Sequence, residues 1–173
     1  MPSRTTRKAA PVRKAAEAAA RPAPAAQLDA FLDKYTPEVA AQARAALRTL
    51  RARLPGAQEL VYDNYNALAI GFAPGDRASQ AIFSIALYPR WISLFFLQNG
   101  TRLRDPAGLL EGGGHQVRHI KLRAPDQLID PAVEDLMAQA LELAAAPIDP
   151  AQPRRLIIKS VSARQRPRRP TGK

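Results

Sequence analysis

The sequence predicts an α+β fold with two layers, in which a mostly antiparallel sheet of five strands packs against N- and C-terminal helices. Three observations predict this class. Apolar residues recur at helical spacing near both ends of the central region, and they alternate with period two between those ends. Links between successive strands are too short for helical crossovers, so most strand pairs should be antiparallel, with helices kept to one face.

Helices are predicted on both sides of the strand region. Residues 28–35 place their apolar side chains on one face of a short helix. Thr36-Pro37 then supplies an N-cap hydroxyl and a proline at the first position of a longer helix, which ends before Pro55-Gly56. Asp130-Pro131 starts the last helix in the same way. The arginines on the outer face of the longer helix are expected to be solvated; they are Arg44, Arg48 and Arg51.

Strands are predicted from Glu59 onward, where the apolar period changes to two. Residues 59–63 and 67–72 form the first two strands, and residues 81–88 give the clearest buried face. Residues 91–97 are apolar on both faces, which is typical of a central strand. The fifth strand is expected from Val117 to Leu122.

Turn and loop signals separate these strands. Pro74-Gly75-Asp76 and Asn99-Gly100 are typical of turns. Residues 105–110 are expected to form a short helix that ends at Gly112-Gly113-Gly114. That glycine loop could present backbone N–H groups to an anion near Arg118. It lacks the known phosphate-loop patterns, however, which favours a simple helix-to-strand connection.

The positive charge lies at the two ends of the chain. The 173 residues include 26 Lys+Arg and 15 Asp+Glu, a net charge of +11. Residues 1–26 carry a net +5 and residues 153–173 carry +8, which leaves −2 for residues 27–152. These boundaries divide the chain into an Ala/Pro-rich basic segment expected to be disordered, an α+β domain, and a basic C-terminal extension.

The basic ends are candidate contacts for nucleic acid. Arg and Lys in flexible chain bind phosphates without reading sequence, and the alternative role for such ends is solubility. Residues 156–161 are β-prone and are expected to dock on the body, after which residues 164–170 should leave it. The candidate nucleic-acid contacts are Arg4, Arg7, Lys8, Arg13, Lys14, Arg164, Arg166, Arg168 and Arg169.

Several classes of site are excluded or disfavoured by composition. The absence of Cys excludes disulfides, thiolate metal sites and a Cys nucleophile. The two histidines, His115 and His119, lie in expected extended chain, where they would be about 13 Å apart and so unable to share one ion. No metal or cofactor is therefore expected. There is no G-x-S-x-G elbow and the carboxylates are scattered, which favours a protein without enzymatic activity.

No apolar run approaches the about 20 residues that a membrane span needs. The N-terminus also lacks the apolar core of a secretory signal. We therefore expect a cytoplasmic protein with no membrane association.

Residues 61–66 and 88–91 form the most unusual polar and aromatic cluster. Strand interiors disfavour Asp and Asn, so a run that holds both between two tyrosines needs a reason. One interpretation is a groove for a protein or small molecule; the other is a strand end whose tyrosines are half-buried at the sheet edge. The candidate ligand-binding residues are Tyr62, Asn64, Tyr65, Arg90, Trp91 and Arg118.

Five blocks occur in an order typical of one family: ELVYDNY (59–65), SIALYPRW (84–91), LLEG (109–112), VRHI (117–120) and IKSVSA (158–163). Through them the chain resembles the YdhG-like bacterial domain family, a domain of unknown function, over residues 28–146 and the C-terminal segment. The resemblance implies a frataxin-like architecture and, as in one branch of the family, an iron chaperone.

Frataxin-type iron binding uses an acidic ridge on the first helix and strand. The corresponding acidic residues here are interrupted by four arginines between residues 44 and 53, so the ridge would attract a cation weakly. These acids are Asp29, Asp33, Glu38, Glu59 and Asp63. The sequence favours a non-enzymatic module that binds a protein or small ligand; nucleic-acid association and iron transfer are the alternatives.

Overall fold

The computed structural model describes residues 21–172, which form an α+β fold with three α-helices and one six-stranded mixed sheet. The α-helices are α2 (Pro24–Leu32), α3 (Pro37–Arg53) and α4 (Pro131–Leu143). The strands are β1 (Gln58–Asp63), β2 (Leu68–Ala73), β3 (Phe83–Leu87), β4 (Ile92–Phe96), β5 (Arg118–Leu122) and β6 (Leu156–Val161). Short 3-10 helices occur at η1 (Ala78–Gln80), η2 (Gly100–Arg102) and η3 (Pro125–Ile129).

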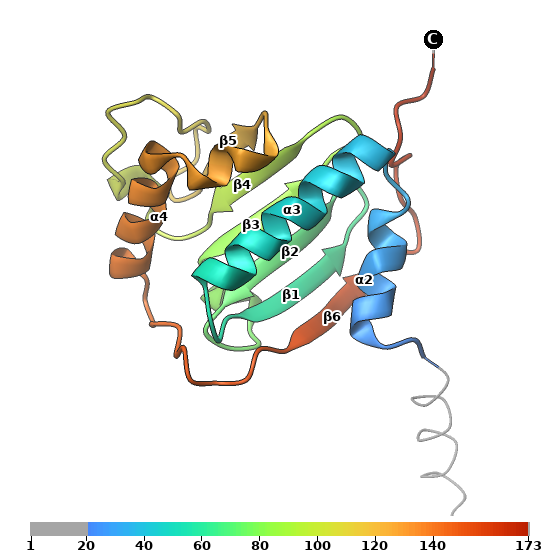
Figure 1. Cartoon of the computed structure of the whole chain (residues 1–173), viewed down its shortest axis with the longest axis horizontal. Helices are drawn as coiled ribbons and strands as arrows, with labels where there is room; N and C mark the ends of the chain where they lie inside the picture. The colour runs from blue at the N-terminus through green and yellow to red at the C-terminus, as the bar shows by residue number, and fades with distance from the viewer. Residues whose placement is uncertain (1–20, 173) are drawn as a thin grey trace, which may run out of the picture.

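The strand order is β5-β4-β3-β2-β1-β6 (Figure 1). The pairs among β1 to β5 are antiparallel, as predicted, but β6 is a sixth strand that pairs parallel to β1. The expected count of five strands was wrong because the C-terminal extension supplies this strand. Leu156 and Ile158 of β6 pack against the main core, so apolar burial accounts for the docking that the sequence predicted.

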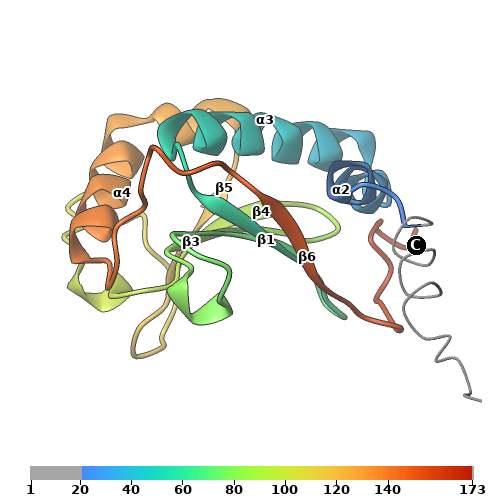
Figure 2. The ribbon, with the colours of Figure 1, turned by 90° about the horizontal axis from the view of Figure 1, so that it is seen from below.

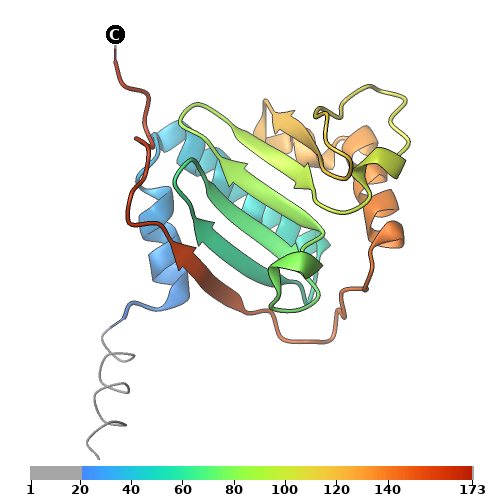
Figure 3. The same cartoon turned by 180° about the vertical axis from the view of Figure 1, so that it is seen from behind.

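The main core lies between the sheet and the helices. Figures 1 and 2 show α3 lying across one face of the sheet, with α2 beside β6. Leu47 and Leu50 of α3 share one buried cluster with Ile70 of β2 and Ile85 of β3. Figure 3 shows the molecule from behind, with the strands in front of α3. The sheet face seen in this view is therefore the one that α3 does not cover.

The helix starts follow the predicted caps. Thr36 Oγ1 accepts a hydrogen bond from the Val39 N–H at 3.4 Å, and Asp130 Oδ1 accepts one from the Ala132 N–H at 2.9 Å. Pro37 and Pro131 each occupy the first helical position, where their missing N–H costs nothing.

The outer-face arginines of α3 are not simply solvated. Arg51 donates two hydrogen bonds, both 2.8 Å long, to the buried carboxylate of Glu59 on β1. Arg44 contacts the carboxylate of Asp33, just after α2, at 2.8 Å. The solvated face predicted for Arg51 was therefore wrong, because the buried carboxylate of Glu59 lies within its reach. Arg44 pairs with an exposed carboxylate and stays partly exposed itself.

The short helix expected over residues 105–110 is not present, and these residues form a turn and loop. The Leu110 N–H donates to Asp105 Oδ2 at 2.7 Å, and Gly108 has a φ of +66°, which a right-handed helix does not allow. Helical structure occurs earlier instead, at η2, after Asn99 adopts a left-handed φ of 54°.

Residues 1–20 and residue 173 lie outside the described range, and with them most of the N-terminal segment expected to be disordered. Within that segment, α2 already begins at Pro24. None of the helices in the described part of the chain has the length and apolar character needed to cross a membrane.

Candidate functional site

Several loops meet at one end of the sheet. Because β1 and β6 are parallel, the residues after Asp63 and after Val161 leave the sheet at the same end. The antiparallel pairs bring the start of β2 and the turn between β3 and β4 to this end as well. The topology therefore places residues 64–67, residues 88–91 and the C-terminal segment, residues 162–172, side by side.

The C-terminal segment packs on the body, so the expectation that residues 164–170 leave it was wrong. The Ser162 N–H donates to the Asp63 carbonyl at 2.8 Å, and the Arg166 N–H donates to the Tyr65 carbonyl at 2.9 Å. The Arg168 side chain is only 4% exposed. A buried carboxylate on the body provides the physical reason for this docking.

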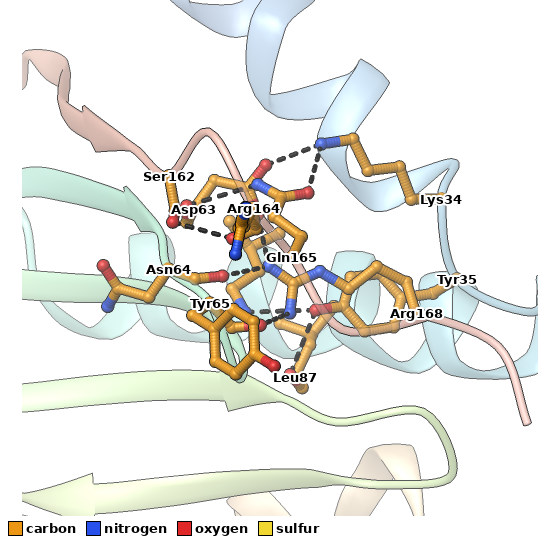
Figure 4. Close-up of polar contacts among 11 residues, drawn as sticks. Lys34, Tyr35, Asp63, Asn64, Tyr65, Leu87, Ser162, Arg164, Gln165 and Arg168 are labelled. Atoms are coloured by element: carbon orange, nitrogen blue, oxygen red, sulfur yellow. Dashed lines mark hydrogen bonds and ion pairs between the residues drawn. The ribbon is translucent and has the colours of Figure 1, made fainter.

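That carboxylate belongs to Asp63, the last residue of β1, whose side chain is 1% exposed. Its Oδ1 accepts from Arg168 Nη2 at 2.7 Å and its Oδ2 accepts from Lys34 Nζ at 2.7 Å (Figure 4). Burial alone would raise the pKa of Asp63, but hydrogen bonds with Lys34, Gln165 and Arg168 outweigh burial and hold this pKa below its usual value. Asp63 therefore carries a negative charge that fixes Arg168 in place.

Arg168 also lies close to Tyr35, which follows α2. The guanidinium carbon of Arg168 is 5.8 Å from the centre of the Tyr35 ring. The Tyr35 hydroxyl donates to the Leu87 carbonyl and accepts from the Leu68 N–H, each at 3.1 Å. Burial raises the pKa of Tyr35 to about 12, so its hydroxyl remains a neutral donor at physiological pH. The same cluster thus joins the C-terminal segment to α2, β2 and β3.

Beside this cluster is a hollow of about 730 Å³, which we call the C-terminal pocket. It lies between residues 88–91 and the C-terminal segment, and no carboxylate is among the described residues that line it. The lining residues are Asn66, Tyr88, Pro89, Arg90, Trp91, Arg166, Pro167, Arg169, Pro170 and Thr171.

Three arginines line the C-terminal pocket: Arg90, Arg166 and Arg169. Uncharged groups hold the side chains of Arg166 and Arg169, so neither positive charge is neutralised by these contacts. Arg169 Nε donates to the carbonyls of Lys34 at 3.3 Å and Tyr35 at 3.1 Å, and its Nη2 donates to a third carbonyl, that of Asp33, at 3.2 Å. The guanidinium carbon of Arg166 lies 5.6 Å from the centre of the Tyr65 ring. Arg90 is exposed in the turn between β3 and β4.

The aromatic wall of the pocket is a stacked pair. The rings of Tyr88 and Trp91 have centroids 5.1 Å apart and an interplanar angle of 23°. A 2.9 Å hydrogen bond from the Tyr88 N–H to the Trp91 carbonyl closes the turn that holds them. Lys121 Nζ lies 4.4 Å from the centre of a Trp91 ring, which adds a cation beside this wall. Burial raises the pKa of Tyr88, so its hydroxyl is neutral near pH 7.

The six ligand-binding candidates from the sequence do not form one surface. Arg90 and Trp91 line the C-terminal pocket, and Tyr65 supports it through Arg166. Tyr62 packs instead with a small apolar cluster around Leu60, and its buried hydroxyl has no hydrogen-bond partner among residues 21–172.

The other two candidates also lie outside the pocket lining. Asn64 is exposed in the turn after β1, where Arg168 Nη2 donates to its carbonyl. Arg118, the first residue of β5, donates to the carbonyls of Gly114 and Val117 at 2.6 and 2.8 Å, in the loop that precedes this strand.

The candidate nucleic-acid contacts are also divided. Arg4, Arg7, Lys8, Arg13 and Lys14 lie outside the described residues. Arg168 is ion-paired and buried, and Arg169 is held by carbonyl groups, so the two residues do not behave as free tail charges. Arg164, Arg166 and Arg169 are all exposed, and Arg168 is the one buried member of the four described arginines.

Sequence reasoning missed Lys34, Gln165 and the pairing of Asp63 with Arg168. One signal was present, because an acid at the end of an apolar strand requires a cationic partner if it is buried. The sequence contains many basic residues, however, and only the position of β6 determines that Arg168 is the one that reaches Asp63.

His119 lies on β5 in extended chain, as predicted, and stacks on Phe95 with ring centroids 5.0 Å apart. His115 is exposed in the preceding loop. Within residues 21–172 there is no group of three or more His, Cys, Asp or Glu side chains that could hold a metal ion.

Comparisons with models of protein families, with curated proteins and with solved structures gave no significant match to the chain. The resemblance to the YdhG-like family therefore stays a prediction, carried by the five sequence blocks alone.

Proposed function

We propose that the protein is a non-enzymatic binding module and that the C-terminal pocket is its site for an anionic ligand. The observation that carries this proposal is the gathering of Arg90, Arg166 and Arg169 around one hollow without a carboxylate in its lining. Guanidinium groups in this setting repel one another, and a bound anion relieves that repulsion while it forms charge-assisted hydrogen bonds.

The dimensions of the pocket support a small ligand. A volume of about 730 Å³ falls within the range of about 300–1,000 Å³ that small-molecule sites occupy. Three prolines and the stacked pair of Tyr88 and Trp91 provide apolar area beside the charges, which is the usual composition of such a site.

The chemistry of the lining supports binding over catalysis. Arginine stays protonated, and the pKa of Tyr88 is raised by burial, so neither provides a general base near pH 7. The remaining side chains of the pocket lining are Asn, Trp, Thr and Pro, which do not titrate in this range.

Iron transfer receives less support from the contacts. Most of the acids that would form the ridge already have cationic partners, which an iron ion would have to displace. The pairs are Asp29 and Asp33 with Arg44, Glu59 with Arg51, and Asp63 with Lys34 and Arg168. Most of the candidate contacts for non-specific nucleic-acid association lie in residues 1–20, outside the described range. The contacts of the described residues therefore do not bear on that alternative.

The proposal is tested by calorimetry and thermal unfolding of the full chain with inorganic phosphate, pyrophosphate, citrate and ATP as probes. At least one probe should bind, and at a concentration of 100 Kd it should stabilise the protein by about 2.7 kcal/mol. For a chain of this size that raises Tm by about 5–10 °C.

Variants then assign the binding to the C-terminal pocket. The double variant Arg90→Ala/Arg166→Ala should lose at least about tenfold in affinity, because each charge-assisted contact is worth about 1.5–3 kcal/mol. The matched control is Arg102→Ala/Arg123→Ala, which removes the same charge at exposed positions outside the pocket lining. Equal losses in both variants, or no probe that binds more tightly than about 1 mM, would refute the proposal.

A further inference from the structure

We propose that the anion bound in the C-terminal pocket is a nucleoside polyphosphate, with its phosphates on the arginines and its base against Tyr88 and Trp91. This inference rests on the proposed function and specifies the ligand class for the same site.

The number of arginines favours a polyphosphate over a single carboxylate. One guanidinium group can satisfy a carboxylate with two parallel hydrogen bonds. Arg90, Arg166 and Arg169 together offer more donors and more charge than one carboxylate uses. A chain of phosphates presents several negative charges and many acceptor oxygens within a few ångströms, which suits a hollow lined by three arginines.

Two of the three arginines, Arg166 and Arg169, are held in position before any ligand arrives. Arg169 uses Nε and Nη2 on three carbonyl groups and has no partner for Nη1 among residues 21–172. Arg166 lies against the Tyr65 ring, and its own backbone N–H is fixed by the Tyr65 carbonyl. Because these contacts restrict the side chains, phosphate binding costs less side-chain entropy than it would on free surface arginines.

The aromatic wall favours an organic group next to the phosphates. A purely inorganic polyphosphate would make no use of the apolar area that Tyr88, Trp91 and the prolines contribute to the pocket lining. A nucleobase is flat and has two π-faces, and base–aromatic stacking is worth about 1–3 kcal/mol per base, or roughly five- to 150-fold in affinity. The hollow of about 730 Å³ has room for a ligand of this size.

The arrangement favours a free nucleotide over a strand of nucleic acid. Strand-binding proteins use a basic groove that follows the backbone, with aromatic side chains placed along it. Here the arginines and the aromatic pair gather around one hollow at the end of the sheet.

The test measures binding of ATP, inorganic tripolyphosphate and adenosine to the full chain by calorimetry, in EDTA so that the phosphates are not shielded by metal. We expect ATP to bind at least about fivefold more tightly than either of its parts. Tyr88→Leu should reduce the difference in affinity between ATP and tripolyphosphate, because it removes an aromatic ring on which the base would stack. Phe95→Leu removes an aromatic ring that is stacked on His119 outside the pocket lining, and it should preserve that difference.

The possible outcomes distinguish a failure of the nucleotide proposal from a failure of the proposed anion site. Equal affinities for ATP and tripolyphosphate would overturn the nucleotide while keeping an anion site. Tight binding of citrate without binding of any phosphate probe would overturn it in favour of a carboxylate. An oligothymidine of twelve residues that binds at least about tenfold more tightly than ATP would overturn it in favour of nucleic acid. Failure of every probe would overturn the proposed function as well.

Discussion

Replacement of Asp63 with Asn should release the C-terminal segment from the body and open the C-terminal pocket. The side chain of Asp63 is 1% exposed and accepts from Arg168 and Lys34, each at 2.7 Å. Asn keeps the size of the side chain but removes its charge, so the guanidinium group of Arg168 would stay buried without a counter-ion.

The loss in the free energy of unfolding caused by Asp63→Asn follows from how deeply each of the two ion pairs is buried. Lys34 is 39% exposed, so its pair with Asp63 contributes only about 0–1 kcal/mol. Arg168 is 4% exposed, and removing one partner of a buried ion pair costs about 3–5 kcal/mol. Because residues 162–172 contain no helix or strand, the segment can swing out and solvate its charge, which limits the loss to the lower end of this range, about 3 kcal/mol. The corresponding fall in Tm is about 6–12 °C.

Limited proteolysis with trypsin reports the release directly. The bond between Arg168 and Arg169 is protected when Arg168 is buried, and mass spectrometry should detect faster cleavage there in Asp63→Asn. Asp126→Asn is the matched control, because it removes the same charge at an exposed position whose side chain has no hydrogen bond among the described residues. The reasoning is refuted if Asp63→Asn matches Asp126→Asn both in this cleavage rate and in Tm.

Two further predictions concern the same ionic contacts. The pKa of Asp63 is lowered in the folded state, so its stabilisation is complete above the unfolded pKa of about 3.9 and is lost as the pH falls through the folded pKa. The difference in Tm between the wild type and Asp63→Asn should therefore be constant near neutrality and should shrink below about pH 4; a difference that grows in acid would contradict the assignment. Arg51→Ala should lower the free energy of unfolding in urea by about 1.5–3 kcal/mol, because the carboxylate of Glu59, 1% exposed, loses its bidentate partner and keeps only Arg154, at 3.6 Å. Arg48→Ala, the control on the same helix, should change that free energy by less than about 0.5 kcal/mol, and equal losses would show that the Glu59 pair contributes nothing specific.

The candidate site was only partly accessible to sequence reasoning. Arg90 and Trp91 stood out because they lie in a turn rich in aromatic and proline residues, and both line the pocket. Arg166 and Arg169 were noticed only as charges in a tail. Their role in the pocket depends on contacts with Tyr65 and with the carbonyls that follow α2, about 100 and 135 residues away in the sequence.

The sequence by itself determined the elements that depend on neighbouring residues. The caps at Thr36 and Asp130, the period-two strands and the antiparallel order of β1 to β5 follow from short-range rules. The tertiary structure alone decided that β6 pairs parallel to β1, which brings the residues that follow both strands to the same end of the sheet. A buried carboxylate selects its partner by proximity in space, so Asp63 could be paired with Arg168 only after the position of β6 was known.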